Sequence, residues 1–287
     1  PAMEKKLKKN KAWQVVLAAA EAIRQIDDPK GVEILISLLK DADGRIKEDL
    51  NDVLVEMTGV DKRGSHATWL DWWNTNKERL IAGTYDKPSR PKGGEKAGGT
   101  TFYGIPVVSS RVVFILDRSG SMSSPAGWKP DTGVATGKDG GGRKPEKVGD
   151  RKIDVAKYEL KNAIRALKPH VRFNVIFYNQ DYMIWLENGL AIANAKSKKE
   201  AIAFIDKLEP EGATNIFDPT EKGFLIQERK DPRAKKDPDI GLIKGGVDTI
   251  YLLSDGHPNN GRITEPGAIL AKVKEINRVR KIVIHSI

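Results

Sequence analysis

Five oxygen-bearing side chains stand after apolar segments, where they could share one cation: Asp117, Ser119, Ser121, Thr214 and Asp255. The first three alternate on a turn opened by Gly120, immediately after the apolar run 112–116, and the last follows the apolar run 249–253. Two carboxylates and three hydroxyls suit Mg²⁺ or Mn²⁺, which prefer six oxygens and keep some waters. Ca²⁺ fits less well because it usually gathers more carboxylate charge. The alternative is that these residues only cap turns and bond to the backbone.

Residues 102–287 must position these side chains, and their pattern alternates buried strands with amphipathic helices. Strands are expected at 112–116, 171–178, 182–186, 249–253 and 282–287. Helices are expected at 153–167, 198–208 and 266–279. This alternation predicts an α/β fold with a doubly wound, Rossmann-like and mostly parallel sheet. Ligands of such sheets bind at the carboxyl ends of the strands, so the loops that carry the five side chains should meet at one edge.

Residues 1–84 have the pattern of short amphipathic helices and predict a smaller, all-helical N-terminal domain. One apolar stripe, for example, comprises Val32, Leu35, Ile36 and Leu39. Short helices joined by an aspartate-rich turn are similar to a HEAT repeat, and a plain helical bundle is the alternative. Three tryptophans between positions 69 and 73 have helical spacing, which predicts core packing. Residues 85–101 are rich in Lys, Pro and Gly and predict a flexible linker.

The second part of the chain resembles the von Willebrand factor type A family in three motifs. They are VVFILDRSGSM at 112–122, GATNIFD at 212–218 and LLSDG at 252–256. The three motifs occur in the family's order, and all five oxygen-bearing positions of its metal site are filled. The resemblance covers residues 102–287. With the helices before it, the layout is similar to bacterial proteins that join HEAT-type repeats to a type A domain.

In that family the five positions form a metal-ion-dependent adhesion site. The resemblance implies that Ser119 and Ser121 bind the metal directly, and that Asp117, Thr214 and Asp255 bind it directly or through water. A carboxylate from a partner protein then completes the coordination. Neutral hydroxyl ligands leave the cation short of negative charge, which explains why it would take an acidic ligand from outside.

Two departures from the family pattern stand out. A type A domain continues past the strand at 282–287 with another strand and a long helix; because the sequence shows neither, we expect a fragment. Residues 123–150, rich in Gly, Lys and Pro, predict an inserted loop beside the metal motif. Candidates for a partner-binding rim around the metal are Arg118, Trp128, Asn215 and His257.

Composition excludes several other classes of site. The chain has no cysteine and only 4 histidines, which rules out thiolate chemistry and disfavours a histidine-built metal centre. Phosphate-binding glycine loops and a GxSxG nucleophile elbow are both missing from the sequence, so no catalytic residue is predicted. No apolar run reaches 18 residues, and membrane insertion is not expected.

The leading hypothesis is a non-enzymatic, metal-dependent protein-binding module with a role in adhesion or assembly. An alternative is RNA binding, because helical repeats joined to a type A domain, with a net charge of +10, are similar in layout to the Ro family. The helical part is much shorter than that family's ring. A third hypothesis is a metal-dependent hydrolase, for which the sequence offers no evident general base or nucleophile.

Overall fold

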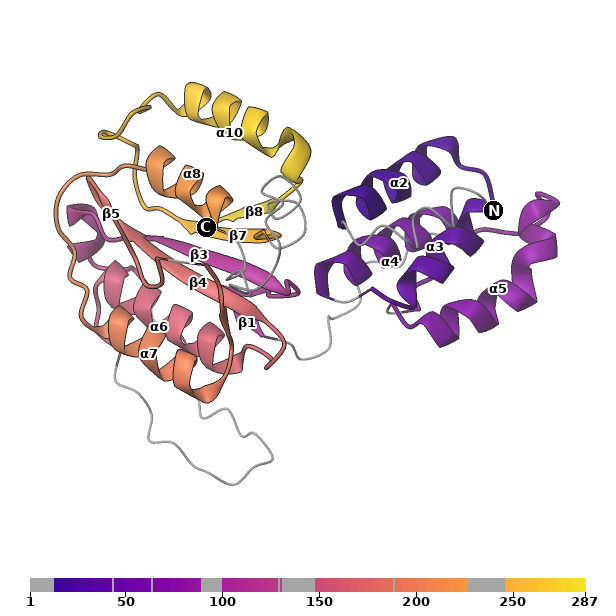
Figure 1. Ribbon diagram of the computed structural model, residues 1–287, viewed down its shortest axis with the longest axis horizontal. Helices are drawn as coiled ribbons and strands as arrows, with labels where there is room; N and C mark the ends of the chain where they lie inside the picture. The colour runs from indigo at the N-terminus through magenta and orange to yellow at the C-terminus, as the bar shows by residue number, and fades with distance from the viewer. Residues whose placement is uncertain are drawn as a thin grey trace, which may run out of the picture.

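The computed structural model describes most of the chain as a helical part followed by an α/β part (Figure 1). The described residues are 13–42, 44–62, 64–88, 100–128, 130, 148–187, 189–226 and 246–287. Most of the expected linker 85–101 and much of the expected loop 123–150 lie outside these residues.

Among the described residues, the N-terminal part has four helices: α2 (Trp13–Ile26), α3 (Gly31–Leu39), α4 (Gly44–Thr58) and α5 (His66–Ile81). Each buries an apolar stripe in one shared core. The three tryptophans of α5 are buried there, as their spacing predicts, and the indole N–H of Trp69 donates to Asn51 Oδ1 at 2.8 Å. No helix among the described residues is both long enough and apolar enough to span a bilayer.

In the described residues of the α/β part, six strands form one sheet in the order β5-β4-β3-β7-β8, with β6 also paired to β4. Its strands are β3 (Arg111–Asp117), β4 (Arg172–Tyr178), β5 (Tyr182–Ile184), β6 (Ala191–Ile192), β7 (Thr249–Leu253) and β8 (Val283–Ser286). Strands β4, β3, β7 and β8 are parallel, whereas β5 and β6 are antiparallel to β4. The expected mostly parallel α/β sheet is therefore confirmed, and the expected strands 171–178 and 182–186 pair as an antiparallel hairpin. A short hairpin, β1 (Thr101–Phe102) with β2 (Ile105–Pro106), precedes the sheet and was not predicted.

Helices cover both faces of this sheet (Figure 1). The core of one face includes residues of α6 (Lys152–Ala166) and α7 (Ala195–Asp206), and that of the other includes residues of α8 (Phe217–Leu225) and α10 (Pro266–Arg280). Alternate residues of β3 enter the two cores, with Phe114 on the α6 side and Ile115 on the α8 side. The helix expected at 198–208 begins three residues earlier, because Asn194 caps it by accepting from the backbone N–H of Ser197 at 2.9 Å.

Strand β3 lies at the topological switch point of the sheet. The chain passes from β3 through α6 to β4 on one side, and strand β7 pairs with β3 on the other. The loops that leave β3 and its neighbours therefore diverge above the carboxyl end of β3, where Asp117 stands.

The two parts of the chain meet at the opposite end of the sheet. The guanidinium of Arg45, on α4, is buried and donates to the backbone oxygens of Asp248 at 2.7 Å and Lys281 at 2.8 Å. Asp248 directly precedes β7. At the expected linker's first residue, Tyr85 packs edge-to-face on Trp72 and joins the helical core.

We predict that Gly223→Ala lowers the free energy of unfolding by about 1–2 kcal/mol, although alanine favours a helix over glycine by about 1 kcal/mol. Gly223 lies where α8 crosses β3, and an added Cβ would stand 2.8 Å from Ile115 Cδ1. Ile115→Val removes that methyl group, so the alanine should cost much less in the double variant. Additive losses in a denaturant double-mutant cycle would contradict this account of the packing.

Candidate metal-binding site

Three loops converge at the carboxyl edge of the sheet, as the sequence predicts. The backbone N–H of Gly120 donates to Gly212 O at 2.9 Å, which joins the first loop to the second. The hydroxyl of Ser254 donates to Asp117 Oδ2 at 3.0 Å, which joins the third loop to the first. The five predicted ligands therefore lie on loops that are hydrogen-bonded to one another.

Asp117 forms the base of the site. Its side chain is fully buried, and its Oδ1 accepts from the backbone N–H of Ser119 at 2.7 Å. Burial raises the pKa of Asp117, against the hydrogen bonds from Ser119 and Ser254, and the charge of Asp255 raises it further. A raised pKa means that the ionised carboxyl of Asp117 lowers the stability of the fold. A cation bound here would stabilise the ionised form and so offset that loss of stability.

A row of oxygens connects Ser119, Ser121 and Asp255. The two serine Oγ atoms are 3.0 Å apart, and Ser121 Oγ is 2.7 Å from Asp255 Oδ1. Adjacent ligands of an octahedral Mg²⁺ ion, with its metal–oxygen distance near 2.1 Å, are about 3.0 Å apart. The spacing and the hard oxygen donors thus fit such a cation. The described residues contain no group of three or more His, Cys, Asp or Glu side chains suited to a metal, so this donor set depends on hydroxyls.

Thr214 lies on the loop whose Gly212 accepts from Gly120, and the segment after β7 holds it in place. Its backbone N–H donates to Asn259 Oδ1 at 2.8 Å, and its carbonyl accepts from the N–H groups of Asn259 at 3.0 Å and Asn260 at 3.2 Å. The side chain is nearly buried, with 5% of the residue exposed. These bonds connect the Thr214 loop with the same chain segment that supplies Asp255.

Lys152 is a neighbour of the site that sequence reasoning missed. Its Nζ lies 2.7 Å from Asp255 Oδ2 and forms an ion pair with that carboxylate. The two residues are 103 positions apart, and Lys152 is 31 positions beyond Ser121 across the expected insertion. No local sequence motif indicates that Lys152 would contact Asp255.

The base of the inserted loop is closed by backbone pairing. Pro125 and Arg151 form an antiparallel bridge, Ala126 N donates to Asp150 O at 2.9 Å, and Lys152 N donates to Ser124 O at 2.9 Å. The insertion therefore leaves and re-enters the domain at one point. Its ends keep the metal motif next to the first turn of α6 despite the added residues.

The four predicted rim residues have different surroundings. Arg118 turns toward Glu211, with a 2.9 Å ion pair, and Asn215 is buried and donates to Asp218 Oδ2 at 2.8 Å. Trp128 is 49% exposed and packs edge-to-face on the ring of Tyr103. His257 is exposed on the loop after Asp255. Trp128 and His257 are thus accessible to a partner, whereas the side chains of Arg118 and Asn215 are used in contacts between loops.

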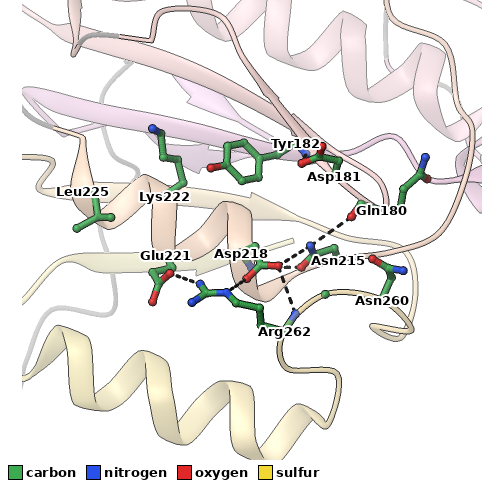
Figure 2. A pocket seen from close by; sticks show the side chains of 11 residues that line it. Gln180, Asp181, Tyr182, Asn215, Asp218, Glu221, Lys222, Leu225, Asn260 and Arg262 are labelled. Atoms are coloured by element: carbon green, nitrogen blue, oxygen red, sulfur yellow. Dashed lines mark hydrogen bonds and ion pairs between the residues drawn. The ribbon is translucent and has the colours of Figure 1, made fainter.

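A groove of about 630 Å³ opens beside the Thr214 loop (Figure 2). Its lining is mostly polar and comprises Gln180, Asp181, Tyr182, Asn215, Asp218, Glu221, Lys222, Leu225, Asn260, Gly261 and Arg262. In Figure 2 Arg262 lies between the carboxylates of Asp218 and Glu221, and it forms an ion pair with each. Sequence reasoning named only Asn215 among these residues, because the groove is built from three distant segments.

Comparison with known proteins gives distant similarities over part of the chain. No known family profile matches the chain. The human inter-alpha-trypsin inhibitor heavy chain H4 is 26% identical over 172 residues, which are 60% of this chain and 15% of that protein. Uncharacterized protein YfbK of Escherichia coli strain K12 is 28% identical over 167 residues, or 58% of this chain and 22% of that one. The chain thus spans less than a quarter of the length of either relative.

Among solved structures, a von Willebrand factor type A protein from Catenulispora acidiphila is similar over 63% of this chain and 33% of its own. The TM-score is 0.41 and the sequence identity is 18%.

We predict that Gly212→Ala destabilises the protein by about 1 kcal/mol more than Gly104→Ala. Both glycines have a left-handed backbone, with φ +75° and φ +74°, so both variants carry the same conformational cost. Only at Gly212 would the new Cβ collide, with Gln180 Oε1, which accepts from Ala213 N at 3.1 Å. Chemical denaturation measures both losses, and equal losses would show that this contact does not hold the loop.

Proposed function

We propose that the α/β part is a non-enzymatic, metal-dependent protein-binding module. Asp117, Ser119, Ser121, Thr214 and Asp255 would hold one Mg²⁺ or Mn²⁺ ion, and an acidic side chain of a partner protein would complete the coordination. The observation that carries this proposal is the row of oxygens from Ser119 Oγ through Ser121 Oγ to Asp255 Oδ1, spaced as adjacent ligands of one small cation.

The charge of the site supports an acidic partner. Ser119 and Ser121, the ligands that would bind directly, are neutral hydroxyls. The carboxylates of Asp117 and Asp255 together carry two negative charges, which only neutralise the charge of a divalent cation. When bound, the metal supplies a concentrated positive charge at an exposed position, since Ser121 lies at the surface. A partner carboxylate is the ligand that such a cation attracts most strongly among protein side chains.

The neighbouring surface would extend the contact and select the partner. The groove beside Thr214 offers the phenol of Tyr182 and the ammonium of Lys222, and exposed Trp128 and His257 lie on loops next to the metal motif. In this proposal the acidic residue of the partner binds at the metal. The residues around it then contact the groove or the exposed loops, which gives specificity beyond a single carboxylate.

The relatives named above lend no support to the RNA-binding alternative, for which the net charge of +10 remains the argument. For the hydrolase alternative, the described contacts supply no histidine beside either serine. The hydroxyl of Ser121 donates to Asp255 and that of Ser119 contacts Ser121, so both serines already belong to the row of proposed metal ligands.

Isothermal titration of Mg²⁺ and Mn²⁺ into the full chain tests the site. We expect saturable binding at one site by the wild type and a loss of at least about tenfold in affinity for Ser119→Ala/Ser121→Ala, because two direct ligands are removed. Ser37→Ala/Ser110→Ala is a matched control, because these hydroxyls contact Ile34 O and Asp248 Oδ2 and lie away from the proposed ligands. Absence of metal binding by the wild type would overturn the proposal.

Metal should also stabilise the fold. We expect Mg²⁺ at about one hundred times its dissociation constant to add about 2.7 kcal/mol to the free energy of unfolding. Asp117→Asn should abolish this gain, because the amide keeps an acceptor for Ser119 N–H but loses the charge. Thermal unfolding with Mg²⁺ and with chelator measures both effects. An undiminished shift in Asp117→Asn would show that Asp117 is not part of the metal site.

A further inference from the structure

The two oxygens of the Asp255 carboxylate have different partners. Oδ1 accepts from the hydroxyl of Ser121 at 2.7 Å, on the side of the proposed metal ligands. Oδ2 accepts from the ammonium of Lys152, also at 2.7 Å. Among the described residues, Lys152 is the cation that forms an ion pair with either carboxylate of the site. One proposed ligand is thus shared between the metal position and a fixed positive charge.

The fold holds Lys152 firmly in this place. Its backbone N–H donates to Ser124 O, within the pairing that closes the base of the inserted loop. The preceding residue, Arg151, is the N-cap of α6 and bonds Asp154 through both its backbone and its guanidinium. Side-chain exposure is 36% for Lys152 and 11% for Asp255, so the pair is only partly screened by water.

This ion pair contributes little to stability by itself, as partly exposed pairs generally do. The effect of Lys152 on the net charge of the metal site is larger. With Asp117 and Asp255 ionised and a divalent cation bound, the ligands and metal are neutral together. The ammonium of Lys152 then leaves one net positive charge at the mouth of the site, beside the position where an outside ligand would bind.

We propose that Lys152 sets the balance between metal affinity and ligand affinity at this site. The inference rests on the proposed metal-binding function. The ammonium competes with the cation for the charge of Asp255, and so weakens metal binding. Once metal is bound, the same ammonium keeps the site positive and strengthens the capture of a carboxylate. Removing it should therefore move the two affinities in opposite directions, which a merely structural ion pair would not do.

The test compares Lys152→Met with Lys161→Met and Lys152→Arg in the full chain. Lys161 lies on the same helix and pairs with Asp206 at 3.0 Å, so its loss changes the net charge equally without touching Asp255. Titration with Mn²⁺ gives the metal affinity. Titration of the Mn²⁺-saturated protein with acetate, followed by water-proton relaxation, gives the carboxylate affinity, because a carboxylate that binds the ion displaces its water.

We expect Lys152→Met to bind Mn²⁺ about 1.5-fold to fivefold more tightly and acetate about 1.5-fold to fivefold more weakly, the range for a partly exposed ion pair. Lys152→Arg and Lys161→Met should stay close to the wild type in both titrations. Circular dichroism confirms that each variant is folded.

The titrations distinguish failure of the proposed metal-binding function from failure of the proposed role of Lys152. If the wild type binds no Mn²⁺, the proposed function itself is overturned. If the wild type binds Mn²⁺ but Lys152→Met matches Lys161→Met in either titration, the role of Lys152 is overturned and the metal site stands.

Discussion

The site depends on one constraint, which is that strand β3 is paired in parallel with a neighbour on each side. That pairing buries Asp117 at the end of the strand, between β4 and β7. Burial of a carboxylate is costly unless hydrogen bonds or a cation offset it. The N–H of Ser119 and the hydroxyl of Ser254 supply the hydrogen bonds, and together they set the shape of the metal motif.

Two further contacts, one at each end of the sheet, fix how neighbouring segments join it. The insertion after the metal motif is closed at its base by the bridge between Pro125 and Arg151, so its length does not change where α6 begins. At the far end of the sheet, Arg45 bonds the backbone just before β7. Strand β7 thus has the helical part at one end and Asp255 just beyond the other, which connects the two halves of the chain through one rigid element.

Sequence reasoning predicted the elements with strong local signals and missed those that depend on partners. Continuous apolar runs identified β3 and β7, because a strand buried on both faces has no polar position. The short hairpin of β1 and β2 and the two-residue strand β6 have no such run, and their pairing is decided by neighbours. Asn215 was expected at a surface rim, yet its amide is used beneath the loop to hold Asp218.

By itself, the sequence determined the set of oxygen-bearing side chains, their positions after strands, and the α/β class that brings strand ends to one edge. Those features follow from local composition and from the general geometry of parallel sheets. Only the tertiary structure decided the spacing of Ser119, Ser121 and Asp255, the contact of Lys152 with Asp255, and the groove beside Thr214. Each of these depends on the packing of segments far apart in the chain, where a shift of one ångström decides whether two polar groups meet.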